Sequence, residues 1–131
     1  KHALKNINLR KVKYDYILDM SYNTPFLNST NIENSVNTMQ IFDADKVIPV
    51  VQETHRYFKH DGNGLKNIVN NVNLKLERNA IYKHIYGFSL FKKNSFFEKD
   101  NKLKIGHVVL SNKESFELRS EEDLKLFSFF K

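Results

Sequence analysis

The chain of 131 residues contains no cysteine and no tryptophan, and it has only four glycines and two prolines. The absence of cysteine excludes disulfide bridges and thiolate metal sites. Four glycines form no glycine-rich phosphate loop. No apolar run approaches the roughly 20 residues that span a membrane, and the first residues lack the continuous apolar stretch of a secretory signal. These absences favour an intracellular, cytoplasmic protein that does not contact a membrane.

Aromatic and basic residues dominate what is present. The chain has 11 phenylalanines and six tyrosines, which predicts an aromatic-rich core. Its formal net charge is +6. Basic blocks at residues 1–14 and 64–97 carry net charges of +5 each and flank an acidic block at residues 15–63, whose net charge is −4. Basic blocks attract phosphate backbones. The charge pattern therefore fits a nucleic-acid partner and a lysine-rich surface that merely keeps the protein soluble equally well.

The length predicts a single domain over residues 1–131. A basic N-terminal arm covers about residues 1–14, and a polar loop rich in Asn, Ser and Thr covers about residues 23–37. The fold class expected is α+β, with short antiparallel strands and hairpins packed with two or three short helices. Short runs of β-forming residues predict strands at residues 8–20, 39–42, 47–51, 107–111 and 115–119.

A helix is expected at the C-terminal end of the chain. Ser120 stands where an N-cap residue belongs, and Asp123 follows three residues later, close to the capping-box pattern. Most phenylalanines of this region are expected to pack in the core.

Two further helical patterns lie within residues 61–87, with a short turn at residues 73–76 between them. Gly87 supplies a stop after the second pattern. Together they predict a helix-turn-helix-like pair. Their apolar stripes, spaced as on one helix face, consist of Leu65, Ile68, Val69 and Val72 in the first and of Ala80, Ile81, His84 and Ile85 in the second.

The second helical pattern supplies a candidate nucleic-acid contact set. If its stripe packs inward, Tyr86 and the polar and basic residues around it face outward. Arginine can bond guanine, asparagine can bond adenine, and lysine can hold phosphate. No catalytic residue, metal ligand or cofactor is expected. The candidate nucleic-acid-binding residues are Arg78, Asn79, Tyr82, Lys83, Lys92 and Lys93.

The order of these elements resembles the DNA-binding modules appended to phage and intron homing endonucleases. Those modules combine a short strand, a helix-turn-helix and a final small residue with aromatics, and here residues 39–48, 64–74 and 80–97 follow that order. The resemblance covers about sixty residues. It implies tethering to a DNA sequence and no chemistry.

The same region is also similar to the HNH nucleases of phage and introns. That resemblance implies a histidine that activates water beside a divalent metal. Lys59 occupies the place of the catalytic histidine, and His60 follows one residue late. An active site would need a one-residue bulge, with His60 as base and His84 as distal ligand; otherwise the matching residues form an ordinary turn. The matching residues are Asp61, Gly62, Asn63, Asn67 and Asn71.

The expected function is therefore a small basic nucleic-acid-binding protein without catalysis, with DNA favoured over RNA. The first alternative is a protein–protein interaction domain or effector from a phage or pathogen, whose partner contacts the acidic block or the aromatic C-terminus. Phe129 and Phe130 are adjacent and cannot both face the core, which favours such a contact. A degenerate HNH-type nuclease is the further alternative.

Overall fold

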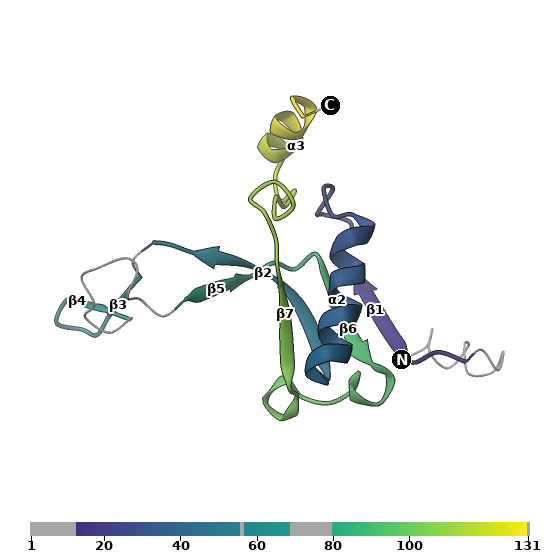
Figure 1. Ribbon diagram of the computed structural model, residues 1–131. Coiled ribbons are helices and arrows are strands. Elements are labelled where there is room, and N and C mark those ends of the chain that lie inside the picture. Colours follow the sequence, from purple (N-terminus) through teal and green to yellow (C-terminus); the bar gives the residue numbers. More distant parts are fainter. Residues whose placement is uncertain (1–12, 56, 69–79, 131) are drawn as a thin grey trace.

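A computed structural model describes residues 13–55, 57–68 and 80–130 (Figure 1). These residues form seven strands and two α-helices, with two short 3₁₀ turns before the last strand. None of the helices they form has the length and apolar character needed to cross a lipid bilayer. The elements are β1 (Tyr16–Met20), α2 (Ser29–Phe42), β2 (Lys46–Glu53), β3 (Phe58–His60), β4 (Leu65–Asn67), β5 (Ile81–His84), β6 (Phe88–Lys92), η2 (Lys93–Ser95), η3 (Asp100–Lys102), β7 (Ile105–Val109) and α3 (Glu121–Ser128).

The main sheet is mixed. β6 lies between β1 and β2 and is antiparallel to both, while β5 pairs with the far half of β2. β7 pairs with β2 in parallel at the other edge. β1, β2 and β7 therefore run in one direction. The mixed α and β class is confirmed, but the expectation of antiparallel strands alone is wrong for the β2–β7 pair.

The central strand β2 forms where an uninterrupted apolar run was expected to form a strand. Val47 and Val50 are fully or almost fully buried, and most of the strand has neighbours on both faces. A strand covered on both faces is selected by a continuous apolar run rather than by alternation, which is why this element is predictable.

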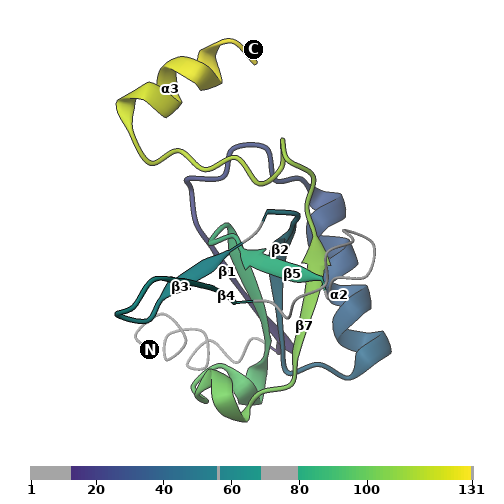
Figure 2. The ribbon, with the colours of Figure 1, turned by 90° about the vertical axis from the view of Figure 1, so that its left-hand side faces the viewer.

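Helix α2 covers one face of the sheet (Figure 2). Asn28 caps it, in a capping box with Asn31, and Asp43 ends it in the left-handed conformation at φ 49°. Its buried positions are Asn31, Ser35 and Met39, at i, i+4 and i+8. The helix replaces both the polar loop expected at residues 23–37, from Ser29 onward, and the strand expected at residues 39–42. Ile32, Val36 and Met39 follow helical spacing, but two of the three buried positions are polar and the surrounding residues are mostly Asn, Ser and Thr, which favoured a loop.

The core lies between α2 and the sheet. Gly106 in β7 allows the close approach, because a Cβ atom there would lie 3.1 Å from the Thr38 methyl group of the helix. The buried cluster consists of Met39, Ala44, Val47, Leu90 and Val108.

The expected helix-turn-helix is wrong. Residues 65–67 form β4, which pairs with β3, and residues 81–84 form β5, which pairs with β2. Gly62 and Gly64, at φ 97° and 146°, allow the tight reversal that makes β3 and β4 a hairpin. The apolar spacing resembled a helix by coincidence, since strand pairing, of β4 with β3 and of β5 with β2, overrides local preference. The expected turn at residues 73–76 lies outside the described residues.

The C-terminal region is partly as expected. β7 overlaps the expected strand at residues 107–111, and α3 begins after Ser120 with a complete capping box that includes Asp123. The strand expected at residues 115–119 does not form: residues 112–115 make a turn in which Glu114 accepts from the Ser111 N–H at 2.9 Å, and residues 116–119 are irregular.

Candidate functional site

A groove opens where β1 ends. Because β1, β2 and β7 are parallel, their carboxyl ends lie at one edge of the sheet, and this edge is where open α/β sheets bind ligands. The groove encloses about 270 Å³. It is lined by Asp19, Met20, Ser21, Tyr22, Tyr86, Phe88 and Ser89.

One wall of the groove is a bulge between β5 and β6. Here residues 85–87 lie opposite Pro49. The Pro49 carbonyl accepts from the Ile85 N–H at 3.0 Å. Proline has no N–H to donate, so a break in the partner strand suits this position. The backbone N–H of Tyr86 is thereby released from the ladder and donates to Glu117 Oε1 at 3.2 Å. Bulges of this kind re-aim side chains beside binding sites, and this one turns Tyr86 into the groove wall.

The loop after β1 packs closely on the bulge. The Ser21 N–H donates to the Gly87 carbonyl at 2.9 Å. A Cβ atom at residue 87 would lie 2.7 Å from Leu27 and 2.9 Å from the Thr24 hydroxyl. Glycine is needed here for close contact between the two segments that line the groove.

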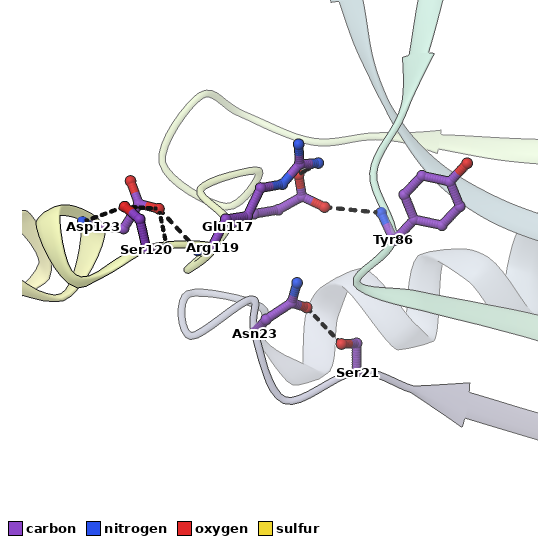
Figure 3. Close-up of polar contacts among 7 residues, drawn as sticks. All are labelled: Ser21, Asn23, Tyr86, Glu117, Arg119, Ser120 and Asp123. Carbon is purple, nitrogen blue, oxygen red and sulfur yellow. Dashed lines mark hydrogen bonds and ion pairs between the residues drawn. The ribbon is translucent and has the colours of Figure 1, made fainter.

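The segment before α3 secures both walls (Figure 3). The Glu117 carboxylate is only 7% exposed and pairs with the Arg119 guanidinium, besides accepting from Tyr86. The Leu118 N–H donates to the Asn23 carbonyl at 2.7 Å, and the Ser21 hydroxyl donates to the Asn23 side chain at 2.5 Å. A buried carboxylate held by two donors fixes its neighbours, because losing either donor leaves a poorly solvated charge.

His84 lies next to the groove wall, with its ring centroid 4.4 Å from that of Tyr86. Burial lowers the pKa of His84 below its usual 6.5, and the Lys46 ammonium lowers it further, against opposing effects of Asp100 and Glu117. Its Nε2 atom is buried and has no hydrogen-bond partner among the described residues. The neutral form of the imidazole beside the groove is therefore favoured.

A second, more open groove adjoins the first and shares Tyr22 with it. It encloses about 540 Å³ and contains the Arg119 side chain, whose charge is balanced by Glu117. Its lining residues are Tyr22, Asn23, Leu118, Arg119, Ser120, Glu121 and Leu124.

The chemistry of the first groove is that of a hydroxyl-binding site. Asp19 and Ser89 are direct cross-strand partners of β1 and β6, so their side chains share one face of the sheet. The lining offers one carboxylate, two hydroxyls and two phenols, and none of its described residues is a cation. Such a surface suits a neutral ligand with several hydroxyl groups better than a phosphate. Within the described ranges, no group of three His, Asp or Glu side chains is placed to hold a metal ion.

Four of the six expected contact residues are described, and they come from two strands and a 3₁₀ turn. Tyr82 and Lys83 are consecutive on β5 and so point to opposite faces. Tyr82 stacks on His107 at 4.8 Å. Lys92 pairs with Asp43 at 2.5 Å, and Lys93 lies over the Tyr14 ring at 4.5 Å.

Arg78 and Asn79 lie outside the described residues. The residues missed from the sequence are Asp19, Ser21 and Glu117. The available signal was an acid near the end of an expected strand, Asp19, and a hydroxyl directly after that strand, Ser21. Tyr86 was expected on an outward face only as part of a helix.

The HNH-like stretch is a hairpin turn. Asp61 Oδ1 accepts from the Asn63 N–H at 3.0 Å, and His60 Nδ1 accepts from the Gly62 N–H at 3.1 Å. His60 ends β3 of the two-stranded sheet, whereas His84 belongs to β5 of the main sheet. The structure thus favours the ordinary turn over a catalytic loop.

These features define a mixed α/β sheet with a groove at its carboxyl edge, and a solved structure has a similar fold. No family model matches the chain, and no curated protein matches its sequence. Its fold is similar to the crystal structure of 4-diphosphocytidyl-2C-methyl-D-erythritol synthase from Anaerococcus prevotii DSM 20548, with a TM-score of 0.64 and 12% identity. The match covers 96% of this chain, which spans 64% of the length of that enzyme's chain.

This comparison corrects the expected function. Its fold is similar to that of a synthase over 96% of the chain, and this finding does not fit the expected nucleic-acid-binding protein built around a helix-turn-helix. The helical pair on which the expectation rested is also replaced by strands at residues 65–67 and 81–84.

Proposed function

We propose that the chain is part of an enzyme that makes or uses a nucleotide-linked polyol, and that the groove at the end of β1 holds the polyol portion. The observation that carries the proposal is the groove itself: a carboxylate, two serines and two tyrosines at the carboxyl edge of a sheet with this fold. The name of the similar synthase joins a diphosphocytidyl group to a methylerythritol, which is a polyol.

The roles of the lining residues follow from their chemistry. The Asp19 carboxylate accepts hydrogen bonds from two neighbouring hydroxyls of the polyol. Ser89, its cross-strand partner, adds a donor and an acceptor. The Tyr22 and Tyr86 rings, both largely exposed, cover the carbon skeleton of the ligand. A lining that lacks cations leaves the phosphates of the ligand outside this groove.

Saturation-transfer NMR tests the proposal directly. The full chain is mixed separately with each of three ligands at millimolar concentration: cytidine 5′-diphosphate-linked ribitol, ribitol and cytidine 5′-diphosphate. We expect the ribitol protons to receive most of the saturation. Asp19→Asn is expected to weaken binding about tenfold or more, since hydrogen bonds to a charged acceptor are worth about 1.5–3 kcal/mol.

The matched control is Asp15→Asn, which removes an exposed carboxylate just before the other end of β1. This variant is expected to bind as the unaltered chain does. Saturation confined to the cytidine protons, or equal binding by the Asp19 and Asp15 variants, would reject the polyol site.

A further inference from the structure

Strand β7 leaves one backbone edge open. Among the described residues it pairs with β2 alone. The Lys104 carbonyl accepts from β2 at 3.3 Å and the Leu110 N–H donates to β2 at 2.8 Å, so alternate residues between them bond to β2. The backbone groups of the intervening residues point outward, to the open side. These residues are Ile105, His107 and Val109, and all three are exposed.

The open edge is not protected against pairing with another strand. Natural sheet edges are blunted by proline, by charged side chains or by a bulge. β7 contains neither proline nor a permanently charged residue, and its register with β2 is unbroken. Its apolar side chains are also accessible, since Ile105 is 42% exposed and Val109 is 52% exposed. The edge therefore offers a free row of donors and acceptors beside apolar side chains.

A groove runs along this edge between β7 and the end of α2, which lie side by side in Figures 1 and 2. The groove encloses about 250 Å³. Thr38 and the largely exposed Phe42 form its helical wall, and Gly106 contributes to the strand side. Because residue 106 has no side chain, a side chain opposite it on an added strand can reach this helical wall.

One end of the groove is positively charged. Lys104 lines the groove, and Lys102 lies in the preceding turn. Both are exposed, and neither forms an ion pair among the described residues. The acids at the junction of α2 and β2, Asp43 and Asp45, already pair with Lys92. The charge at this end therefore suits a carboxylate supplied by an occupant of the groove.

We propose that this groove takes an extended segment of a partner protein as an added strand, antiparallel to β7. Addition of a strand to a sheet edge is a recurring mode of peptide recognition, in which backbone hydrogen bonds supply affinity and alternate side chains supply specificity. Antiparallel pairing is slightly the more stable arrangement. β7 itself contains no carboxylate, so a second copy paired edge to edge would leave Lys104 without a counterion.

The register defines the chemistry of the recognised segment. The partner residue opposite Gly106 places an apolar side chain against Thr38 and Phe42. Two residues later in the partner, a carboxylate lies opposite Lys104 on the same face of the sheet. The segment therefore reads apolar, any residue, acidic.

Fluorescence polarisation with a synthetic peptide tests the groove. The probe is fluorescein-labelled TSVLTET, which is designed so that its leucine lies opposite Gly106 and its glutamate lies opposite Lys104. We expect saturable binding to the full chain at micromolar protein. Replacing the leucine by aspartate, or the glutamate by lysine, is expected to weaken binding at least about tenfold.

N-methylation of the peptide shows whether it adds as a strand. In the proposed register the valine of the peptide lies opposite His107 and exchanges both backbone hydrogen bonds with it. An N-methyl group on this valine is expected to weaken binding at least about tenfold. The matched control is an N-methyl group on the leucine, whose N–H points away from β7, and this change should leave binding nearly as it was.

Two substitutions at residue 107 test the same bond from the side of the chain. His107→Pro removes the outward N–H and keeps the bonds of β7 to β2, since an edge strand tolerates proline where its N–H faces solvent. His107→Ala removes the ring that stacks on Tyr82 and keeps the N–H. We expect the proline variant to lose peptide binding and the alanine variant to retain it, with circular dichroism checking that both are folded.

Charge reversal tests the end of the groove. Lys104→Glu is expected to bind the peptide with lysine in place of glutamate more tightly than TSVLTET, which reverses the preference of the unaltered chain. Lys125→Glu, in α3 and outside the groove, is the control and should leave that preference unchanged.

Four results would overturn the proposal. The first is no saturable binding of TSVLTET, and the second is an equal effect of the two N-methyl groups. The third is a folded His107→Pro variant that binds as tightly as His107→Ala. The fourth is a dimer of the chain, seen by sedimentation velocity, that His107→Pro dissociates, because the edge would then belong to a second copy. The N-methylated peptides decide the question even where His107→Pro does not fold.

Discussion

Replacing Glu114 by glutamine is expected to loosen the segment that holds the groove walls together. One oxygen of the Glu114 carboxylate accepts from the Asn28 and Asn31 amides at 3.2 and 2.9 Å, and the other accepts from the Ser111 N–H and hydroxyl at 2.9 and 2.6 Å. The two bonds from the amides join the turn after β7 to the start of α2, and the two from Ser111 close that turn. Glutamine keeps only one acceptor oxygen and directs an amide donor at groups that are themselves donors.

The size of the effect follows from the pKa. Hydrogen bonds from Ser111 and then from Asn31 lower the pKa of Glu114 from 4.5 to about 2. At about 1.4 kcal/mol for each tenfold change in proton affinity, the upper limit is about 3.4 kcal/mol. Glu114 is partly exposed and solvent screens it, so we expect Glu114→Gln to lower the free energy of unfolding by about 1–2 kcal/mol at pH 7.

The sign of the pH dependence is fixed by the lowered pKa. The stabilisation is complete above pH 4.5, where the carboxylate is ionised in the folded and unfolded chains, and it is lost as pH falls toward about 2. Urea unfolding followed by circular dichroism should show the two proteins converging over this range. The control, Glu98→Gln, changes an exposed glutamate that accepts no side-chain hydrogen bond from the described residues. Parallel curves for the unaltered chain and Glu114→Gln would refute the reasoning.

Two further perturbations test the groove wall. Burial lowers the pKa of His84, so its neutral form contributes stability that is complete above pH 6.5 and is lost as pH falls below that value. His84→Gln should remove this part of the pH dependence in urea unfolding, and an unchanged dependence would contradict the assigned burial. Gly87→Ala is expected to cost about 1–3 kcal/mol of unfolding free energy, since its new methyl group overlaps Leu27 and Thr24. Gly106→Ala, whose new methyl group would lie 3.1 Å from the Thr38 methyl group, should lower the free energy of unfolding by less. The reverse order would show that the loop over Gly87 moves aside at little cost.

Elements of the fold were predictable where a local sequence pattern was compatible with only one secondary structure. The apolar run of β2 and the capping box of Ser120 and Asp123 each specify one structure, and both elements form where expected. Helix α2 was missed because Asn31 and Ser35 occupy its inner face, where they bond within the helix and to Glu114 rather than supplying apolar burial.

The groove depends on contacts that sequence patterns do not contain. Asp19 and Ser89 are seventy residues apart and meet only because β6 pairs with β1. Tyr86 was singled out as an outward residue, but its place in the wall follows from the bulge opposite Pro49 and from the buried carboxylate of Glu117. Strand pairing and a bulge are tertiary effects, and the helical spacing of residues 80–85 concealed them.

The bulge at residues 85–87 also links the groove to the segment before α3. The Tyr86 N–H, released from the strand ladder, donates to Glu117 Oε1 at 3.2 Å, while Tyr86 lines the groove. A ligand that shifts the backbone of Tyr86 would therefore also change how Glu117 is held. Thermodynamic linkage then requires a change at Glu117 to alter ligand affinity by the same factor.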